Sequence, residues 1–209
     1  MSPRSHYSPI RASLLVLALG LLAALCAAPS ASAETPLDEL RRALALQGRP
    51  VPPEIFRDMG DGDLGDSGPI LVTVDVKAAI GSERYGDEIK RNGDWVVQSR
   101  PAANTLNGAE ETAYEFKGRT RNGLLVVVAT YSGGGSGVFT TLHILDATAD
   151  RAFDADGKVY QRIDLTVLRS VPLGDRWEGD VTISGDAVRI ATTNTPAESV
   201  PKEIEAWRP

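Results

Sequence analysis

The only imidazole and thiol groups of the 209-residue chain belong to His6, His143 and Cys26. An imidazole that acts as a catalytic base needs a nucleophile and an orienting carboxylate within hydrogen-bonding distance. His143 lies in an expected strand, and Asp146, three residues further on, belongs to the opposite face of that strand. The pattern predicts a histidine at the edge of the core, hydrogen-bonded to its neighbours, and we name no catalytic residue.

A glycine-rich segment, Ser132-Gly133-Gly134-Gly135-Ser136-Gly137, is the clearest candidate for a binding loop. A phosphate-binding loop needs a Lys and a Ser or Thr at the start of a helix, whereas here Val138 begins an expected strand. The segment therefore predicts a wide hairpin loop. Four glycines in six residues cost backbone entropy, which is tolerated more readily where another backbone or a ligand comes close. We expect a contact surface at Gly133, Gly134, Gly135, Ser136 and Gly137, and expect bulky residues at Gly134 or Gly135 to abolish partner binding without unfolding.

Four aspartates crowd the acidic loop over residues 57–69: Asp58, Asp61, Asp63 and Asp66. Calcium binds carboxylate oxygens on flexible acidic loops. The spacing of Asp61 and Asp63 begins an EF-hand loop, but Gly65 replaces the third oxygen ligand and Val72 replaces the required glutamate. A solvated acidic turn without metal or other cofactor is the favoured interpretation. In the alternative, a calcium-stabilised structural module, the ligands would be Asp61, Asp63 and Asp66.

The same loop contains Gly65-Asp66-Ser67-Gly68-Pro69, which resembles the nucleophile segment of trypsin-like serine proteases with one glycine missing. That glycine belongs to the loop whose backbone N–H groups stabilise an oxyanion. The family also places its histidine before the serine, whereas His143 follows Ser67. We therefore expect a turn that leads into a strand at Ile70.

Paired carboxylates are the one familiar reactive arrangement that needs neither histidine nor cysteine, since two acids can hydrolyse a glycoside. The chain has 28 acidic residues, but no spacing selects a pair. Its aromatic residues, 6% of the chain, are also few for a cleft that stacks sugars. A His-independent, glycosidase-like hydrolase is therefore kept as the alternative function.

The start of the chain has the organisation of a signal peptide. Arg4 and Arg11 are basic, Leu14–Leu25 is an uncharged apolar run, and Ala31-Ser32-Ala33 has the small-x-small pattern of a cleavage site. The run is shorter than the roughly 20 residues of a spanning helix. Leu25 precedes Cys26 where a lipidated cysteine usually follows a small residue, so lipidation is disfavoured. We predict a signal peptide over residues 1–33, cleavage between Ala33 and Glu34, and a periplasmic or secreted protein with no membrane segment.

Cleavage would sharpen what the composition excludes. It would leave 20 basic and 28 acidic residues, which is a formal charge of −8. The whole chain already has a sequence pI near 5.0, and this acidity argues against nucleic-acid binding. It would also leave His143 as the only histidine and no cysteine. Zinc sites built from Cys and His, and cysteine nucleophiles, are therefore excluded.

One helix is expected, after the cleavage site. Thr35 is a suitable N-cap, Pro36 suits the first helical position, and leucines recur at helical spacing, which predicts a helix over Pro36–Gln47. Prolines follow, with a further helical turn at Glu54–Arg57. Residues 34–69 therefore form a helix and a Pro- and Asp-rich lead-in.

From Ile70 onward the hydrophobic period changes to two, which indicates strands. The run Leu124–Tyr131 is almost wholly apolar and β-branched, so it predicts a central strand covered on both faces. Tight turns are expected at Asn92-Gly93, Asn107-Gly108, Asn122-Gly123 and Asp156-Gly157. The expected strands are Ile70–Ala78, Trp95–Ser99, Thr112–Lys117, Leu124–Tyr131, Val138–Ala147, Val159–Val171, Val181–Ile183 and Val188–Ile190.

Because no long helical pattern separates these strands, they predict a mainly β fold, a single antiparallel β-sandwich or open barrel of about eight strands with a short N-terminal helix. The β domain is assigned to residues 70–193. Residues 194–209 form either a polar tail or a late edge strand near Ile204–Trp207.

Two segments carry a resemblance to known sequences: Val127–Phe139, which includes the glycine loop, and Leu173-Gly174-Asp175-Arg176-Trp177. Together they resemble uncharacterised exported bacterial β-rich proteins, which share a Gly-Gly-x-Gly-aromatic hairpin and a Leu-Gly-Asp-Arg turn. Their acidic loop often reads Asp-Leu-Asn-Gly-Asp-Gly, from which this chain departs after Asp63-Leu64. The resemblance implies a periplasmic β domain and no activity.

The leading hypothesis from the sequence is an exported, non-enzymatic β domain that binds a protein or a cell-envelope component through loops at one end of the sheet. The expected partner is an envelope protein or a cell-wall component, not a nucleic acid or a membrane. The oligomeric state has no signal in the sequence.

Overall fold

The computed structural model describes residues 34–60, 73–101, 108–192 and 195–199. The chain divides into two compact units, Met1–Glu34 and Thr35–Pro209, and all the described helices and strands belong to the second. The expected signal peptide, the calcium candidates, Ser67 and the segment Ile204–Trp207 lie outside the described residues. Within the described ranges, no helix has both the length and the apolar character needed to cross a membrane.

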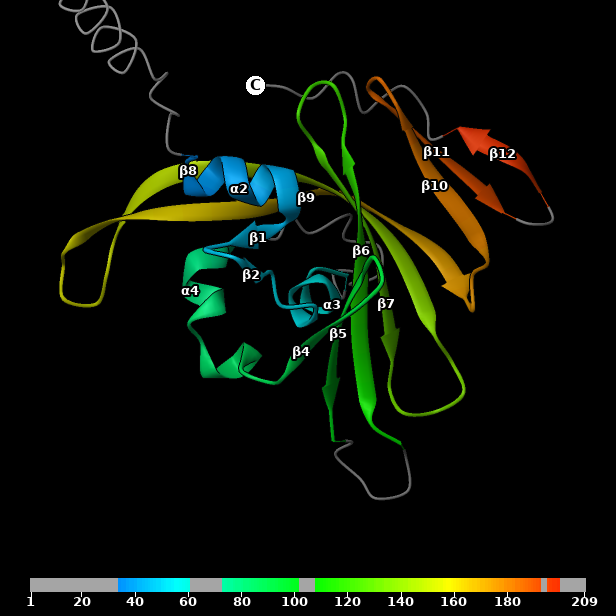
Figure 1. Ribbon diagram of the computed structural model, residues 1–209, viewed down its shortest axis with the longest axis horizontal. Coiled ribbons are helices and arrows are strands. Elements are labelled where there is room, and N and C mark those ends of the chain that lie inside the picture. Colours follow the sequence, from blue (N-terminus) through cyan, green and yellow to red (C-terminus); the bar gives the residue numbers. More distant parts are fainter. Residues whose placement is uncertain (1–33, 61–72, 102–107, 193–194, 200–209) are drawn as a thin grey trace, which may run out of the picture. The chain divides into compact units, whose positions relative to one another are not determined.

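A seven-stranded antiparallel sheet forms the centre of the domain (Figure 1). Its strand order is β3-β9-β8-β7-β6-β5-β4, so most neighbours in the sheet are also neighbours in the sequence. The bounds are β3 Thr73–Asp75, β4 Ile89–Asn92, β5 Trp95–Arg100, β6 Glu110–Arg119, β7 Leu125–Ser132, β8 Phe139–Phe153 and β9 Val159–Asp175. The predicted mainly β, antiparallel fold is confirmed.

Strand β7 is covered on both faces, as its apolar sequence predicted. Leu125 and Val127 pack into one core, on the face of the sheet that the helices cover. Val126 and Val128 alternate with them and pack into a second core, beneath the strands β10 and β11. We call these two sides of the sheet the helix face and the hairpin face.

The helix face is covered by short elements that precede or interrupt the strands. In the core between them and the sheet, Phe56 meets Tyr114 edge-on, with ring centroids 4.8 Å apart. The elements are α2 Pro36–Ala43, β1 Ala45–Leu46, β2 Arg49–Pro50, α3 Glu54–Gly60, α4 Val76–Ile80 and the 3-10 helix η2 Glu83–Tyr85.

Helix α2 starts as predicted but ends four residues early. Thr35 caps it by accepting a hydrogen bond from the backbone N–H of Asp38. The prediction that it reaches Gln47 was wrong, because Leu44 is fully buried with a left-handed φ of 48°. Gln47 and Gly48 also have positive φ and form the turn between β1 and β2, where the Glu39 carboxylate accepts hydrogen bonds from both backbone N–H groups.

The expected strand Ile70–Ala78 is also corrected in part. Ile70 to Val72 lie outside the described residues; in the described part, Thr73–Asp75 is a strand and Val76–Ile80 is the helix α4. The Asp75 carboxylate accepts hydrogen bonds from the backbone N–H groups of Lys77 and Ala78, which is the contact that starts a helix. Val76 and Ala79, three residues apart, are then both buried against the core.

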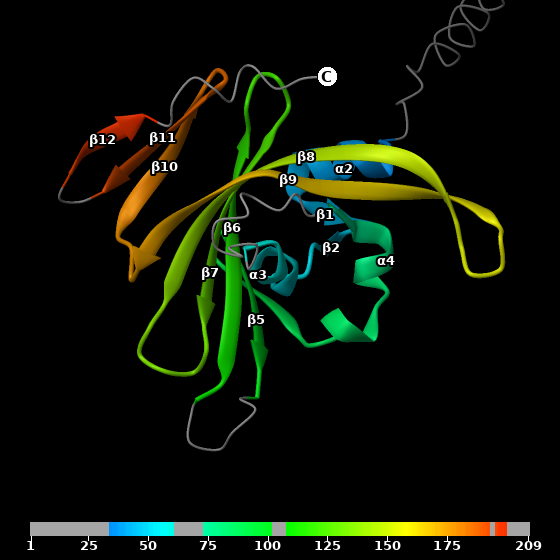
Figure 2. The same cartoon turned by 180° about the vertical axis from the view of Figure 1, so that it is seen from behind.

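The hairpin face is covered by a three-stranded sheet, β10 Gly179–Ser184, β11 Ala187–Thr192 and β12 Thr195–Ser199 (Figure 2). The predicted hairpin at Val181–Ile183 and Val188–Ile190 is confirmed. Its tip is held to the turn between β6 and β7, because the Asp186 carboxylate accepts hydrogen bonds from the Arg121 guanidinium and from the backbone N–H of Asn122. The last strand, β12, lies in residues 194–209, which were expected to form either a polar tail or a late edge strand.

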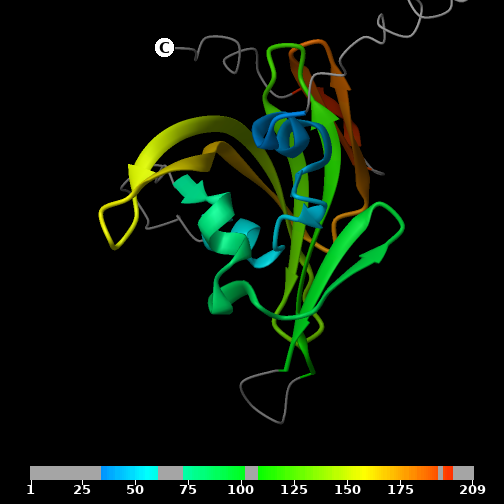
Figure 3. The same ribbon diagram turned by 60° about the vertical axis from the view of Figure 1, so that its left-hand side comes forward.

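Strands β8 and β9 are longer than predicted and continue together as a two-stranded ribbon (Figure 3). Their final residue pair, Phe153 and Val159, is exposed. With the short strands β1, β2, β4 and β12, the described residues contain twelve strands where about eight were expected. The turns at Gly93, Gly123 and Gly157 all have the positive φ that their sequences predicted.

Candidate functional site

The glycine loop and the Leu173–Trp177 turn, which carried the resemblance to exported β proteins, lie against each other at one end of the sheet. The backbone N–H of Val138 donates to the Asp175 carboxylate at 2.7 Å, and the backbone N–H of Arg176 donates to the carbonyl oxygen of Val138 at 2.7 Å. The Arg176 guanidinium donates twice to the carbonyl oxygen of Ser136, at 3.0 Å from Nε and 2.8 Å from Nη2. Four hydrogen bonds therefore fix the second half of the loop.

The first half of the glycine loop is fixed by a contact within the chain. The backbone N–H of Gly108 donates to the carbonyl oxygen of Gly134 at 2.9 Å. A Cβ atom on Gly134 would lie 2.2 Å from the Gly108 carbonyl oxygen, and its φ is +83°. Position 134 therefore requires glycine because the Gly108 backbone lies directly against it. A Cβ atom on Gly135, in contrast, would meet nothing within 4 Å.

These contacts change the meaning of the glycine-loop hypothesis. A bulky residue at Gly134 would disturb the domain itself, so that position does not distinguish partner binding from folding. Gly135 and Ser136 are exposed, and a Cβ atom on Gly135 would have no steric cost inside the chain.

Beside this loop, the hairpin face of the sheet carries a row of side chains across three strands. In the strand register Trp95 of β5 pairs with Glu115 of β6, which in turn pairs with Val128 of β7. The register between β6 and β7 shifts between Phe116 and Gly118, so Lys117 is the extra residue of a β-bulge. The bulge adds a charged side chain to this row.

The row forms the floor of a pocket of about 220 Å³. Two of the three tryptophans of the chain, Trp95 and Trp177, line it, and both are half-buried. The segment that leads from β9 into β10 forms one wall, with Arg176, Trp177 and Glu178. Val138, which directly follows the glycine loop, lines it as well, so the end of the loop lies next to the pocket.

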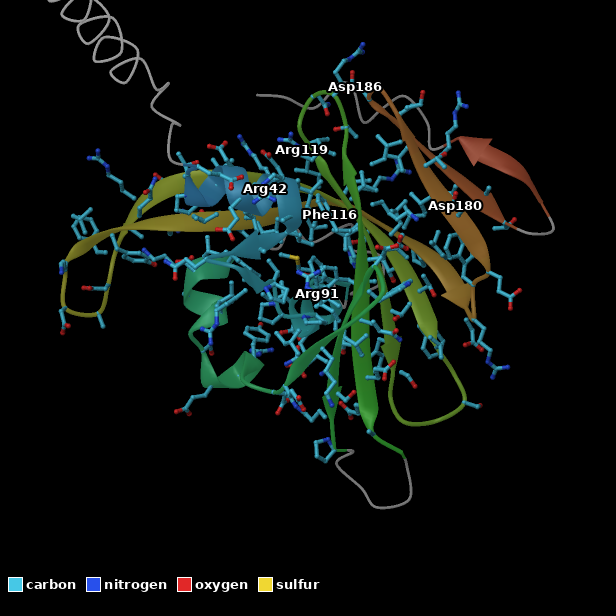
Figure 4. All side chains as sticks on the ribbon, in the orientation of Figure 1. Arg42, Arg91, Phe116, Arg119, Asp180 and Asp186 are labelled. Atoms are coloured by element: carbon cyan, nitrogen blue, oxygen red, sulfur yellow. The ribbon has the colours of Figure 1, made fainter. Side chains whose placement is uncertain are left out.

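Lys117 ties the floor of the pocket to the β10 strand. Its ammonium nitrogen lies 3.0 Å from the Glu115 carboxylate and 3.2 Å from that of Asp180. Figure 4 shows Asp180 on the β10 side of β6, whereas Phe116 lies on the other side of that strand. Burial acts to lower the pKa of Lys117, but the hydrogen bonds with Glu115 and Asp180 raise it overall, so the ammonium group stays charged.

Trp177 lies directly on the backbone of β10. A Cβ atom on Gly179 would be 2.4 Å from its ring, so the close approach requires glycine. Within the described part of the chain, the indole Nε1 of Trp177 is buried and has no hydrogen-bond partner. A buried donor without a partner is costly, and a bound group that accepted from it would remove that cost.

His143 is a buried residue on the helix face, away from this pocket. It packs near Phe56, with ring centroids 6.1 Å apart, and its Nδ1 shares a hydrogen bond of 2.9 Å with the Ser170 hydroxyl. Burial lowers its pKa to about 4, so the ring is neutral at pH 7. The predicted hydrogen-bonded structural histidine is confirmed, although it is fully buried instead of lying at the edge of the core.

A second group of charged side chains lies at the edge of the helix face. The Glu54 carboxylate, on α3, is largely buried and accepts a hydrogen bond of 2.9 Å from Arg100, which also donates to Asp87 at 2.8 Å. Burial raises the pKa of Glu54. These acids are joined through arginine and hold α3 against β5, which is a structural role. Within the described ranges no three acidic, histidine or cysteine side chains group as metal ligands.

Comparisons with protein-family models, with curated proteins and with solved structures gave no match to this chain. The site is therefore interpreted from its own geometry.

Sequence reasoning missed the pocket residues Trp95, Glu115, Lys117 and Trp177. One signal was present: Gly118 directly follows the expected strand Thr112–Lys117, and a glycine within a continuing strand indicates a β-bulge. The meeting of Trp95 with Trp177 had no local signal, since the two lie in distant parts of the sequence. The low aromatic content of the chain argued against a cleft that stacks sugars, but the structure places two of the three tryptophans in one pocket.

Proposed function

We propose that the protein is an exported, non-enzymatic β domain that binds a component of the cell envelope through the loops at one end of its sheet. The observation that carries this proposal is the set of four hydrogen bonds that holds Ser136 and Val138 against Asp175 and Arg176, at the border of the pocket. A surface that is fixed before binding loses less entropy on binding than a free loop. The signal-peptide pattern of residues 1–33 supports the location.

The pocket has the features of a small binding site. It is concave, with apolar side chains such as Val128 and Val181 between a few polar ones. The one imidazole of the proposed exported chain lies on the opposite face of the sheet, buried and hydrogen-bonded to Ser170. Binding therefore accounts for the arrangement of the pocket without a role for His143.

Co-sedimentation with isolated cell walls and with membrane vesicles from the same envelope tests the proposal. The wild-type protein should pellet with one of the two fractions, and Arg176→Gly should reduce the bound fraction at least fivefold, because the loop loses both guanidinium hydrogen bonds. Arg151→Ala, which removes an exposed arginine on the β8–β9 ribbon, is the matched control and should bind normally. Equal binding by the wild type and Arg176→Gly would overturn the proposal.

A glycosidase-like hydrolase is the second candidate, because Glu115 and Glu178 both line the pocket. Two carboxylates on either side of a glycosidic bond are the minimum for its hydrolysis. Release of reducing ends from isolated cell walls, abolished by Glu115→Gln or Glu178→Gln, would establish this function and replace the binding proposal. Binding without release of reducing ends supports the binding domain.

A further inference from the structure

We infer that the pocket recognises a single neutral pyranose ring, one sugar of an envelope glycan. This inference rests on the proposed function and names the ligand class for the same site. Three properties of the pocket carry it: its aromatic side chains, its charge balance and its size.

The first property is the pairing of indole rings with an apolar floor. Trp95 and Trp177 line the pocket together with Val128 and Val181. A pyranose ring presents one face of C–H groups, which packs on the electron-rich face of an indole, while its hydroxyl groups point outward from the ring edge. Neither an extended lipid chain nor a small ion would use both indoles in this way.

The second property is the balance of charge. The lining contains two acids, Glu115 and Glu178, and two bases, Lys117 and Arg176. The formal charges of these four side chains cancel, and Lys117 is also paired with Asp180 from outside the lining, so the pocket has no excess positive charge that would attract a phosphate. A neutral ligand fits this balance better than an ionic one.

The charged groups also keep free capacity for hydroxyl groups. The Lys117 ammonium has three N–H donors and uses them on two carboxylates, and a carboxylate such as Glu115 accepts more than one hydrogen bond. A sugar hydroxyl both donates and accepts, so it can bridge an ammonium and a carboxylate that already face each other. Thr130 and Thr140, which also line the pocket, add side chains with a hydroxyl group.

The third property is size. The volume of about 220 Å³ is below the range of roughly 300–1,000 Å³ that holds drug-sized ligands. It suits one ring, with the neighbouring sugars outside. Val138 and Arg176, which are exposed and belong to the fixed loop and turn, border the opening where those sugars would continue.

Intrinsic tryptophan fluorescence of the purified protein tests the inference with four probes: an N-acetylglucosamine tetramer, cellotetraose, the dipeptide D-Ala-D-Ala and inorganic phosphate. One of the two neutral sugars should change the emission saturably. The dissociation constant should change less than twofold between low salt and about 0.5 M salt, because screening acts on charges and not on a neutral ligand.

Variants connect the signal to the pocket. Trp95→Ala and Glu115→Gln should each weaken sugar binding at least tenfold, whereas Trp95→Phe, which keeps an aromatic face, should weaken it less. Phe153→Ala removes an exposed aromatic side chain from the β8–β9 ribbon and should leave binding unchanged. The melting temperature of each variant separates a loss of binding from a loss of folding, and Glu115→Gln preserves the shape of the side chain.

The outcomes distinguish the inference from the proposed function. Saturable binding of only the dipeptide or phosphate, or sugar binding that Trp95→Ala and Glu115→Gln leave intact, overturns the pyranose inference. If cell walls still bind in an Arg176-dependent manner, the proposed function survives that result. If neither cell walls, membrane vesicles nor soluble probes bind, both are wrong.

Discussion

Arg176 donates two hydrogen bonds to the carbonyl oxygen of Ser136, which precedes it by 40 residues. Its own backbone has a left-handed φ of 48°, which is unfavourable for a residue with a side chain. The guanidinium thus reaches the glycine loop from a strained backbone position. Strain of this kind gathers at functional sites, where the surrounding structure maintains it.

The first prediction separates stability from binding at this position. Arg176→Gly removes the guanidinium but relieves the left-handed strain, which costs about 1 kcal/mol for a side-chain-bearing residue. Because the Arg176 side chain is also largely exposed, we expect the free energy of unfolding to change by less than about 1 kcal/mol. Urea unfolding measures this. A loss of several kcal/mol would show that the arginine supports the fold and not only the loop.

The second prediction concerns two adjacent glycines in the loop. Gly134→Ala places a Cβ atom against the Gly108 backbone at a positive φ, so it should destabilise the domain by about 2 kcal/mol or more. Gly135→Ala, with open space around it, is the matched control and should change the unfolding free energy by less than about 0.5 kcal/mol. Equal melting temperatures for the two variants would contradict the loop geometry.

The strands and turns were largely predictable because their signals are local. Runs of alternating apolar residues, or of continuous apolar residues for β7, located β5 to β9, and Asn-Gly or Asp-Gly located turns at Gly93, Gly123 and Gly157. The early end of helix α2 was not predictable, because Leu44 ends the helix by packing into the core in a left-handed conformation, which is a tertiary effect. The helix α4 was missed because the alternation from Ile70 outweighed the N-cap signal of Asp75, although that signal was visible in the sequence.

The pocket was harder to predict because its residues come from separate strands. The β6 bulge at Lys117 and the turn after Asp175 bring Glu115, Lys117 and Trp177 together. A bulge alters which face a side chain joins, and the pairing partners of a strand depend on the whole sheet. The glycine loop was found because its composition is unusual, but the role of Gly108 in fixing it required the structure.

The third prediction concerns the tie between β6 and β10. Lys117→Met removes both ion pairs and leaves the partly buried Glu115 carboxylate without its partner ammonium, so it should destabilise the domain by about 1 kcal/mol or more. Lys90→Met breaks an ion pair with Glu88 in which both side chains are exposed, and should change stability by less than about 0.5 kcal/mol. Chemical unfolding of both variants makes the comparison, and a larger effect for Lys90→Met would contradict it.

The fourth prediction concerns the arginine that neutralises Glu54. Arg100→Ala leaves a largely buried carboxylate without its main cationic partner and should cost about 2 kcal/mol at pH 7. Burial already raises the pKa of Glu54, and removal of Arg100 should raise it further. An acid with a raised pKa in the folded state destabilises that state as the pH rises through its titration. The cost should therefore shrink as the pH falls from 7 to 5.

The double variant Arg100→Ala, Glu54→Gln provides the control for that experiment. It removes the buried charge together with its partner, so it should recover part of the stability lost in Arg100→Ala, about 1 kcal/mol. It should also lose the pH dependence between 7 and 5. A double variant that is less stable than Arg100→Ala at pH 7 would show that packing, not the uncompensated charge, causes the loss.

The last prediction is the pH dependence that His143 confers. Its pKa is lowered from 6.5 to about 4 by burial, so between these values the unfolded chain binds a proton that the folded chain does not. Stability should therefore fall as the pH decreases from 6.5, by about 2 kcal/mol at pH 5 and about 3 kcal/mol below pH 4 from this group alone.

Carboxylates titrate in the same window, so the test is the difference between the wild type and His143→Gln, measured by urea unfolding from pH 7 to pH 4. His143→Gln can keep a hydrogen bond to Ser170 but does not titrate, so its stability should depend less on pH. Parallel curves for the two proteins would mean that the imidazole is reached by water and protonated in the folded state.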